Sequence, residues 1–222
     1  MFGSTIINPI SNLEVKDCEV EEIIANSFKN FHAKGLDYIC IHRSKKETVK
    51  VYFLDGDVTK LPEVINPHDH RYNFNTEVLA GAYVDHVYKE ESRDSRIGDP
   101  YKTYAYLTPL NGGNGFTEIG HKEVYLNRYR SARCTVGNLP IISPAPRIHT
   151  IQMINDQTVL MLRQFEDVLP LDVATTCYIK EGYTKPDTTG LYDKFTADEL
   201  IARLKIIDHL SHLKNKRLSY GK

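Results

Sequence analysis

The sequence has no long hydrophobic run. The longest uninterrupted apolar stretches in its 222 residues span only a few positions, whereas a helix that crosses a bilayer needs ~18 or more. Residues 1–17 also lack the basic and apolar regions of a secretory signal peptide. We therefore expect no membrane-spanning helix, no export and no membrane partner.

Cysteine and surplus charge are also scarce. The four cysteines lie far apart and form no CxxC motif, which is typical of a reduced compartment rather than of a disulfide framework. The 28 basic residues balance 29 acidic ones, so the formal net charge is -1 and no global field attracts nucleic acid. With 41% apolar residues, the chain can bury a core. We predict a cytoplasmic globular protein without a nucleic-acid partner.

Several familiar catalytic motifs are absent as well. The sequence contains no Walker loop, no GxSxG and no HExxH motif. The glycine-rich stretch 112–115 neither follows a clear strand nor opens a helix, so it is a weak candidate for a phosphate loop. No other catalytic pattern competes with the histidines described below.

The spacing of apolar residues predicts a helix near each end of the chain and strands between them. Residues 17–34 and 196–213 have the helical period, with a basic, frayed tail after the second helix. Between them the period changes to two, and short segments separated by turn residues predict a barrel or sandwich over about residues 36–180. The predicted strands are 36–43, 48–54, 77–88, 103–108, 122–135, 149–154 and 158–165. We predict a single domain, residues 1–222, of the mainly β class.

The two predicted helices need a surface on which to bury their apolar stripes, because a filled barrel has no room for them inside. We expect this surface to be the outer wall of the barrel or the interface of a homodimer, the commonest oligomer. The stripes include Ile23, Phe28 and Phe31 in the first helix and Leu200, Leu204 and Ile207 in the second. The charged stretch 89–102 is predicted to be a solvated loop between strands.

The informative segment contains His68 and His70, two residues apart. In a strand, side chains at this spacing project to the same face, so both imidazoles would point at one position. Neutral imidazole binds Fe(II), Mn, Ni, Cu and Zn, so the pair predicts a divalent metal without identifying it. Of the other histidines, His42 is expected to pack in the core and His86 to lie on the surface.

The segment 66–83 resembles the first motif of the cupin superfamily, which combines a proline, an HxH pair, a following strand and a glycine that closes a turn. These features are Pro67, His68, His70 and Gly81 in this sequence. The pattern His-Asp-His-x-x-x-Phe is especially similar to a group of small metal cupins of bacteria and phages. The resemblance covers roughly residues 38–164. It implies a double-stranded β-helix (cupin) barrel with a central metal, here with flanking N- and C-terminal helices.

The resemblance also implies one more histidine on a later strand. Residues 146–151, followed by 158–162, are the only good match to the second cupin motif, so His149 is the expected third ligand. Arg147 flanks this histidine, and a guanidinium that faces the cavity would bind a carboxylate or a phosphate.

One position departs from the cupin pattern. Many cupins place a ligating Glu four residues after the second His, and here that position is Phe74. The nearest acidic candidate, Glu77, has the opposite parity from His70 along an unbroken strand and would point outward. A three-histidine site, similar to that of thiol dioxygenases, is therefore predicted, with Glu77 as a fourth ligand only if a β-bulge reverses the phase.

Together these features predict a metal-dependent cupin enzyme, namely a mononuclear Fe(II) dioxygenase or related oxygenase that acts on a small polar molecule. The expected cofactor is one divalent ion, Fe(II) in preference to Zn, Mn, Ni or Cu. Two alternatives stay open, because a fold does not determine a reaction. One is a non-enzymatic cupin that binds or sequesters a small molecule, and the other is a metal-independent epimerase in which a His acts as base and a Tyr as acid.

Overall fold

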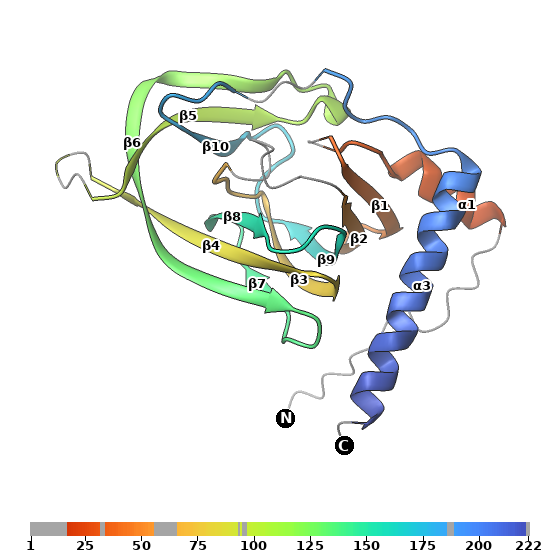
Figure 1. Cartoon of the computed structure of the whole chain (residues 1–222). Helices are drawn as coiled ribbons and strands as arrows, with labels where there is room; N and C mark the ends of the chain where they lie inside the picture. The colour runs from red at the N-terminus through yellow and green to blue at the C-terminus, as the bar shows by residue number, and fades with distance from the viewer. Residues whose placement is uncertain are drawn as a thin grey trace.

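The computed structural model describes residues 17–31, 34–55, 66–92, 94, 97–185 and 189–220 (Figure 1). Within these ranges, ten strands form two five-stranded antiparallel sheets. The first sheet has the order β1-β2-β9-β3-β7, with strands Leu36–Arg43, Glu47–Leu54, Thr158–Asp167, Tyr72–Ala80 and Ile141–Ser143. The second has the order β10-β5-β6-β4-β8, with strands Thr175–Lys180, Asp99–Leu107, Gly115–Thr135, Ala82–Glu91 and Ile148–Met153. The predicted mainly β class is confirmed.

The 21-residue strand β6 organises the second sheet. It pairs with β5 along its first part and with β4 along its second, and its ribbon arches along one side of the molecule (Figure 1). An apolar cluster joins the two sheets, with Leu54, Val78 and Leu160 from the first and Tyr83, Cys134 and Met153 from the second. The two sheets therefore meet in a shared apolar cluster.

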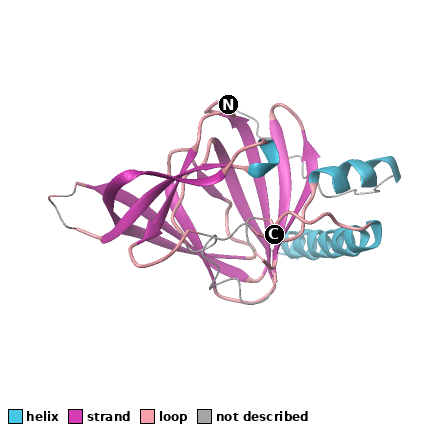
Figure 2. Cartoon of the chain, turned by 90° about the horizontal axis from the view of Figure 1, so that it is seen from above, coloured by secondary structure: helices cyan, strands magenta, loops and turns pink. Residues whose placement is uncertain are grey.

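Alternation along β2 places its side chains in two environments. Val51 and Phe53 belong to an apolar cluster that includes Leu200 and Ile207 of the helix α3 (Ala197–Tyr220). Their neighbours Lys50 and Tyr52 point to the opposite side, into a cavity. Figure 2 shows α1 and α3 together on one side of the sheets. The apolar stripe of the second helix thus packs on the outer face of the first sheet, as predicted.

The first helix, α1, spans Asp17–Asn26, so the prediction that it continues to residue 34 is wrong. After it, the backbone pairs with distant strands and loops instead of continuing the helix. Phe28 exchanges two backbone hydrogen bonds with Tyr38 of β1, at 2.9 and 2.8 Å, and Lys29 N donates to the Asp193 carbonyl at 2.7 Å. These tertiary hydrogen bonds use the groups that a further helical turn would need.

The shorter helix changes the place of two predicted stripe residues. Ile23 packs in the outer apolar cluster, as expected. Phe28 and Phe31 follow the helix and line the cavity instead of the outer wall. Phe31 stacks on Tyr38 with ring centroids 4.3 Å apart.

The end of the second helix also differs from the prediction. Helix α3 continues to Tyr220, beyond the predicted end at residue 213, because its 24 residues contain neither Gly nor Pro. Within the described ranges, no helix has the length and apolar character needed to cross a membrane.

Both ends of the stretch 89–102 are strand rather than loop, because β4 ends at Glu91 and β5 begins at Asp99. Glu91 of β4 pairs with Tyr125, and Asp99 of β5 pairs with Leu126, so both strands extend along β6. Charged side chains can project from such strands into solvent, and composition alone did not reveal the pairing.

Candidate metal centre

The HxH segment is an extended chain that precedes β3, so the prediction that it lies within a strand is wrong in detail. Backbone hydrogen bonds fix it on three sides. His68 exchanges two of them with His149, at 2.9 and 3.0 Å, Asp69 N donates to the Thr176 carbonyl at 3.1 Å, and His70 N donates to the Ala145 carbonyl at 3.0 Å. The segment is therefore tied directly to β8, which carries the third histidine.

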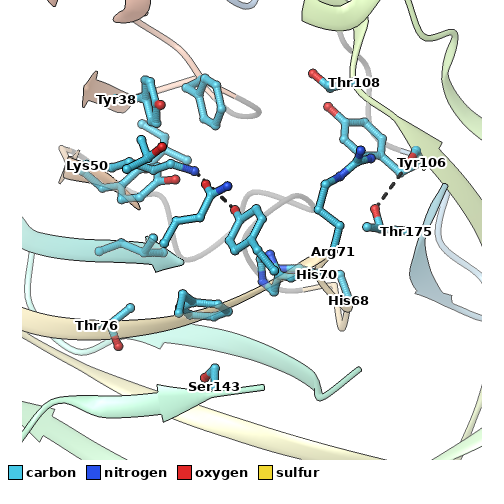
Figure 3. Close-up of a pocket in the computed structure, with 18 of the residues that line it drawn as sticks. Tyr38, Lys50, His68, His70, Arg71, Thr76, Tyr106, Thr108, Ser143 and Thr175 are labelled. Carbon is cyan, nitrogen blue, oxygen red and sulfur yellow. Dashed lines mark hydrogen bonds between the residues drawn. The ribbon is translucent and has the colours of Figure 1, made fainter. Parts of the chain in front are cut away.

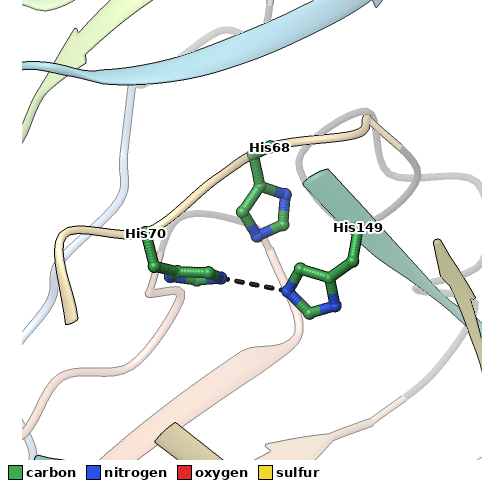
Figure 4. A group of neighbouring side chains, drawn as sticks. All are labelled: His68, His70 and His149. Carbon is green, nitrogen blue, oxygen red and sulfur yellow. Dashed lines mark hydrogen bonds between the residues drawn. The ribbon is translucent and has the colours of Figure 1, made fainter. Parts of the chain in front are cut away.

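The structure brings all three predicted histidines together. One ring nitrogen of each of His68, His70 and His149 lies within 4.8 Å of the others, and the three rings face a common point (Figure 4). The Nε2 atoms of His70 and His149 are 3.0 Å apart. Two nitrogens each about 2.1 Å from one ion are roughly 3 Å apart when the N–metal–N angle is near 90°. The donor set and its spacing fit a divalent metal.

Hydrogen bonds at Nδ1 leave Nε2 of two histidines available as ligand atoms. His68 Nδ1 lies 3.0 Å from the Asn66 carbonyl oxygen, and His149 Nδ1 lies 2.9 Å from Oδ1 of Asp85. Because a carbonyl and a carboxylate only accept, each Nδ1 carries the hydrogen and each Nε2 keeps its lone pair. His149 Nε2 then accepts from His70 Nε2, and a bound metal would replace that hydrogen.

A buried ion pair supports His149 from behind. Asp85 of β4 binds His149 Nδ1 with one carboxylate oxygen and the Arg147 guanidinium with the other. Burial acts to raise the pKa of Asp85, but the hydrogen bond from His149 and the charge of Arg147 outweigh it, so this pKa lies below its usual value. The ionised carboxylate fixes the ring orientation and increases the basicity of Nε2. Arg147, considered above as a substrate contact, instead holds Asp85.

His68 is in its metal-binding protonation state at neutral pH. Burial, together with the nearby His149, lowers the pKa of His68 to about 4, although the Asn66 carbonyl acts in the opposite direction. The ring is therefore neutral over the physiological range, as a ligand must be.

Glu77 lies on the opposite face of β3 from the cavity. Tyr72, Phe74 and Thr76 line the cavity, and Glu77 is not among the lining residues described. The pairing of β3 with β9 shifts register between Tyr72 and Phe74, yet the side chains of both residues line the cavity. Phe74, at the position of the usual cupin Glu, packs edge-on against His70 with ring centroids 4.7 Å apart.

The three histidines open into a cavity of about 620 Å³ between the sheets. Figure 3 shows His68 and His70 on one part of its wall and Tyr38 and Lys50 on another. Much of the remaining lining is aromatic, including Phe28, Phe31, Tyr52, Tyr72, Phe74, Tyr106, Phe116 and Tyr192. The space is large enough for a small organic molecule beside a metal ion.

Two other histidines differ from their predicted places. His42 is exposed, because the register of β1 shifts between Cys40 and His42 and reverses the alternation. His86 is buried, with its ring nitrogens 2.8 Å from Ser131 Oγ and 2.9 Å from Gln152 Oε1. Neither histidine lines the cavity.

Replacing Asp85 with asparagine should weaken metal binding without abolishing it. The variant loses the ionised partner of His149 and leaves the Arg147 guanidinium buried without its carboxylate. Losses of this kind cost about 10–100-fold in metal affinity. Competition against a chromophoric chelator measures the change, and an unchanged affinity would contradict the supporting role of Asp85.

Glu77→Gln is the matched control, since it is also a carboxylate-to-amide change. Its metal affinity should stay within a small factor of the wild type, because Glu77 lies outside the cavity lining. Complete loss of metal in Glu77→Gln would show instead that this site is a three-His, one-Glu centre.

No family model matches the sequence, and no curated protein matches it. Among solved structures, one that is similar is the crystal structure of a hydroquinone 1,2-dioxygenase in complex with Cd2+ and 4-hydroxybenzonitrile. The two are 13% identical, the likeness covers 68% of this chain and 72% of that chain, and the TM-score is 0.33. A likeness at this TM-score identifies neither the family nor the reaction of the present chain.

Proposed function

We propose that His68, His70 and His149 hold one divalent metal ion at the centre of a cupin-type double-stranded β-helix, and that the protein is a mononuclear metal-dependent enzyme. One observation carries the proposal: three imidazoles from two separate segments converge in one cavity, with Nδ1 of His68 and of His149 engaged by acceptors. A histidine that only filled the core would also need partners for its ring nitrogens, as His86 has, so the convergence of three rings is what distinguishes this site.

Fe(II) is the ion we favour, over Zn, Mn, Ni and Cu, and the proposed reaction is that of a dioxygenase or related oxygenase. Three neutral imidazoles would leave the charge of the ion uncompensated and several coordination positions open. Open positions are also a feature of the two-His, one-carboxylate sites of non-haem Fe(II) oxygenases. Fe(II) bound there would supply redox chemistry with O2 that side chains lack. The chain itself would orient His149 through Asp85 and exclude water with the aromatic lining.

A cytoplasmic location is part of the proposal. Cys40 and Cys134 are free, buried thiols, which agrees with a reduced compartment.

A non-enzymatic binding protein is the second candidate, because the cavity of about 620 Å³ could hold a small molecule without any reaction. Oxygen consumption separates the two functions. The protein is reconstituted anaerobically with Fe(II), mixed with a panel of small organic acids and phenols, and exposed to air in an oxygen-electrode cell. Substrate-dependent oxygen uptake that is absent in His149→Ala supports the enzyme. Binding of panel members without uptake favours the binding protein, and uptake that persists after chelation would contradict the metal-dependent function.

A further inference from the structure

Lys50 is a buried cation that faces the cavity. It lies in the middle of β2, is 6% exposed, and lines the same cavity as the three histidines. A lysine ammonium has three donors, and the hydrogen bond found for it is a long one, 3.4 Å to the Tyr72 hydroxyl (Figure 3). Its Nζ also lies 4.7 Å from the centroid of the Tyr72 ring and 5.7 Å from that of Tyr38. A charge this deeply buried is costly unless a negative group compensates it.

The carboxylates that line the described part of the cavity are engaged elsewhere. Asp85 binds His149 and Arg147. Asp69 accepts from the backbone N–H of Thr176 at 2.7 Å. Asp167 accepts from the Gln164 amide at 3.1 Å. Among the described residues, none of these three forms an ion pair with Lys50.

The other two cations of the cavity lining also have partners. Arg71 donates to the backbone carbonyls of Leu171, at 2.7 Å, and of Val173, at 3.2 Å, in the segment after β9. Arg43 donates to the Tyr38 hydroxyl at 3.1 Å and, unlike Lys50, is exposed to solvent. Lys50 is therefore the cavity cation best placed to receive an anion from outside the protein.

Aromatic rings connect Lys50 to the metal centre. The Tyr72 ring contacts the Lys50 ammonium on one side and lies 5.4 Å, centroid to centroid, from the His70 ring. The rings of Phe31, Tyr38 and Tyr52 continue the apolar wall, with Phe31 and Tyr38 stacked and Tyr38 edge-on to Tyr52 at 5.5 Å. A molecule held by Lys50 would thus rest on aromatic faces and extend toward the histidines.

We propose that Lys50 binds the carboxylate of the substrate, and that the substrate class is a small organic acid with an apolar, flat body. This inference rests on the proposed function, because it names the substrate class of the same cavity. Lys50 binds and orients this acid, and His68, His70 and His149 lie beyond its apolar body.

Benzoate is the probe, and calorimetric titration of the full chain is the measurement. Benzyl alcohol has the aromatic ring of benzoate without its carboxylate, and acetate has the carboxylate without the ring. Titrations are made with and without EDTA, so that binding to Lys50 is distinguished from a carboxylate that coordinates a metal. We expect benzoate to bind most tightly of the three, in both conditions.

Lys50→Met should weaken benzoate binding by about 10–100-fold, the range for a hydrogen-bonded charge pair. Lys50→Arg, which keeps the charge, should restore most of the affinity. Lys46→Met, an exposed lysine next to the same strand, should bind benzoate like the wild type. Lys50→Gln is the second variant if Lys50→Met does not fold.

Three results would overturn the inference: no benzoate binding, equal binding by Lys50→Met and the wild type, or binding that EDTA abolishes.

The midpoint temperature of thermal unfolding gives an independent test. Lys50→Met should unfold at the same or a higher temperature, because the substitution removes an uncompensated buried charge, whereas a purely structural lysine would lower it. The metal content of Lys50→Met should equal that of the wild type. A failure of the proposed anion site therefore leaves the metal centre untouched, and a failure of the metal centre leaves the anion site untouched.

Discussion

His149→Ala should fold like the wild type and lose stoichiometric metal. His149 supplies one of three converging ring nitrogens, and removal of a ligand costs more than the ~10–100-fold that follows changes behind a ligand. Elemental analysis of the purified variant after dialysis measures the loss, and circular dichroism checks the β fold. His68→Ala and His70→Ala should give the same result.

His86→Ala is the matched control for these variants. His86 is also a buried histidine, but it contacts Ser131 and Gln152 and does not line the cavity. Its removal should leave the metal content unchanged. Full metal occupancy in His149→Ala, or loss of metal in His86→Ala with the fold intact, would contradict the ligand assignment.

Leu200→Ala should lower the free energy of unfolding by about 2–5 kcal/mol, the range for truncating a buried leucine. Leu200 is fully buried, at 0% exposure, in the cluster that joins α3 to Ile39, Val51 and Phe53 of the first sheet. Urea unfolding followed by circular dichroism measures the change. Metal content should not change, because none of the described side chains of α3 lines the cavity.

Ile201→Ala is the control, because it truncates an aliphatic side chain on the exposed side of the same helix. Ile201 follows Leu200 in α3 but is 38% exposed, so its truncation should cost clearly less than that of Leu200. If the two variants were equally stable, α3 would not be held on the sheet by the stripe that contains Leu200, Leu204 and Ile207.

The sequence was sufficient to predict that His68, His70 and His149 lie together. His68 and His70 are two residues apart in an extended segment, and this local spacing brings both rings to one side even though the segment lies outside β3. His149 followed from the second motif, at the start of a strand that was also predicted. Local alternation and one motif therefore located the candidate ligands.

The groups around the histidines could not be predicted, because they depend on pairing between distant strands. Asp85 reaches His149 because β4 and β8 pair with Val87 opposite His149, which places Asp85 one step along the same face. No spacing between residues 85 and 149 encodes this register. Lys50 posed a related problem: alternation groups it with Tyr52, but only the packing of α3 on the other face shows which side is the cavity.

The end of the first helix illustrates the same limit. Helical spacing continued through Phe28 and Phe31, but the Ser27 hydroxyl accepts a hydrogen bond from the Cys40 backbone N–H at 3.0 Å and Phe28 pairs with Tyr38. These contacts with β1 end the helix at Asn26, although the local helix propensity would allow it to continue. As a result, both phenylalanines belong to the cavity wall.

Elemental analysis of the full chain, purified without a metal-affinity tag, tests the metal centre most directly. We expect one equivalent of a divalent transition metal per chain in the wild type and none in the variant that combines His68→Ala, His70→Ala and His149→Ala. A wild-type protein that contains no metal and takes up none when Fe(II) or Zn(II) is added, or a triple variant that retains a full equivalent, would show that these histidines do not form a metal centre.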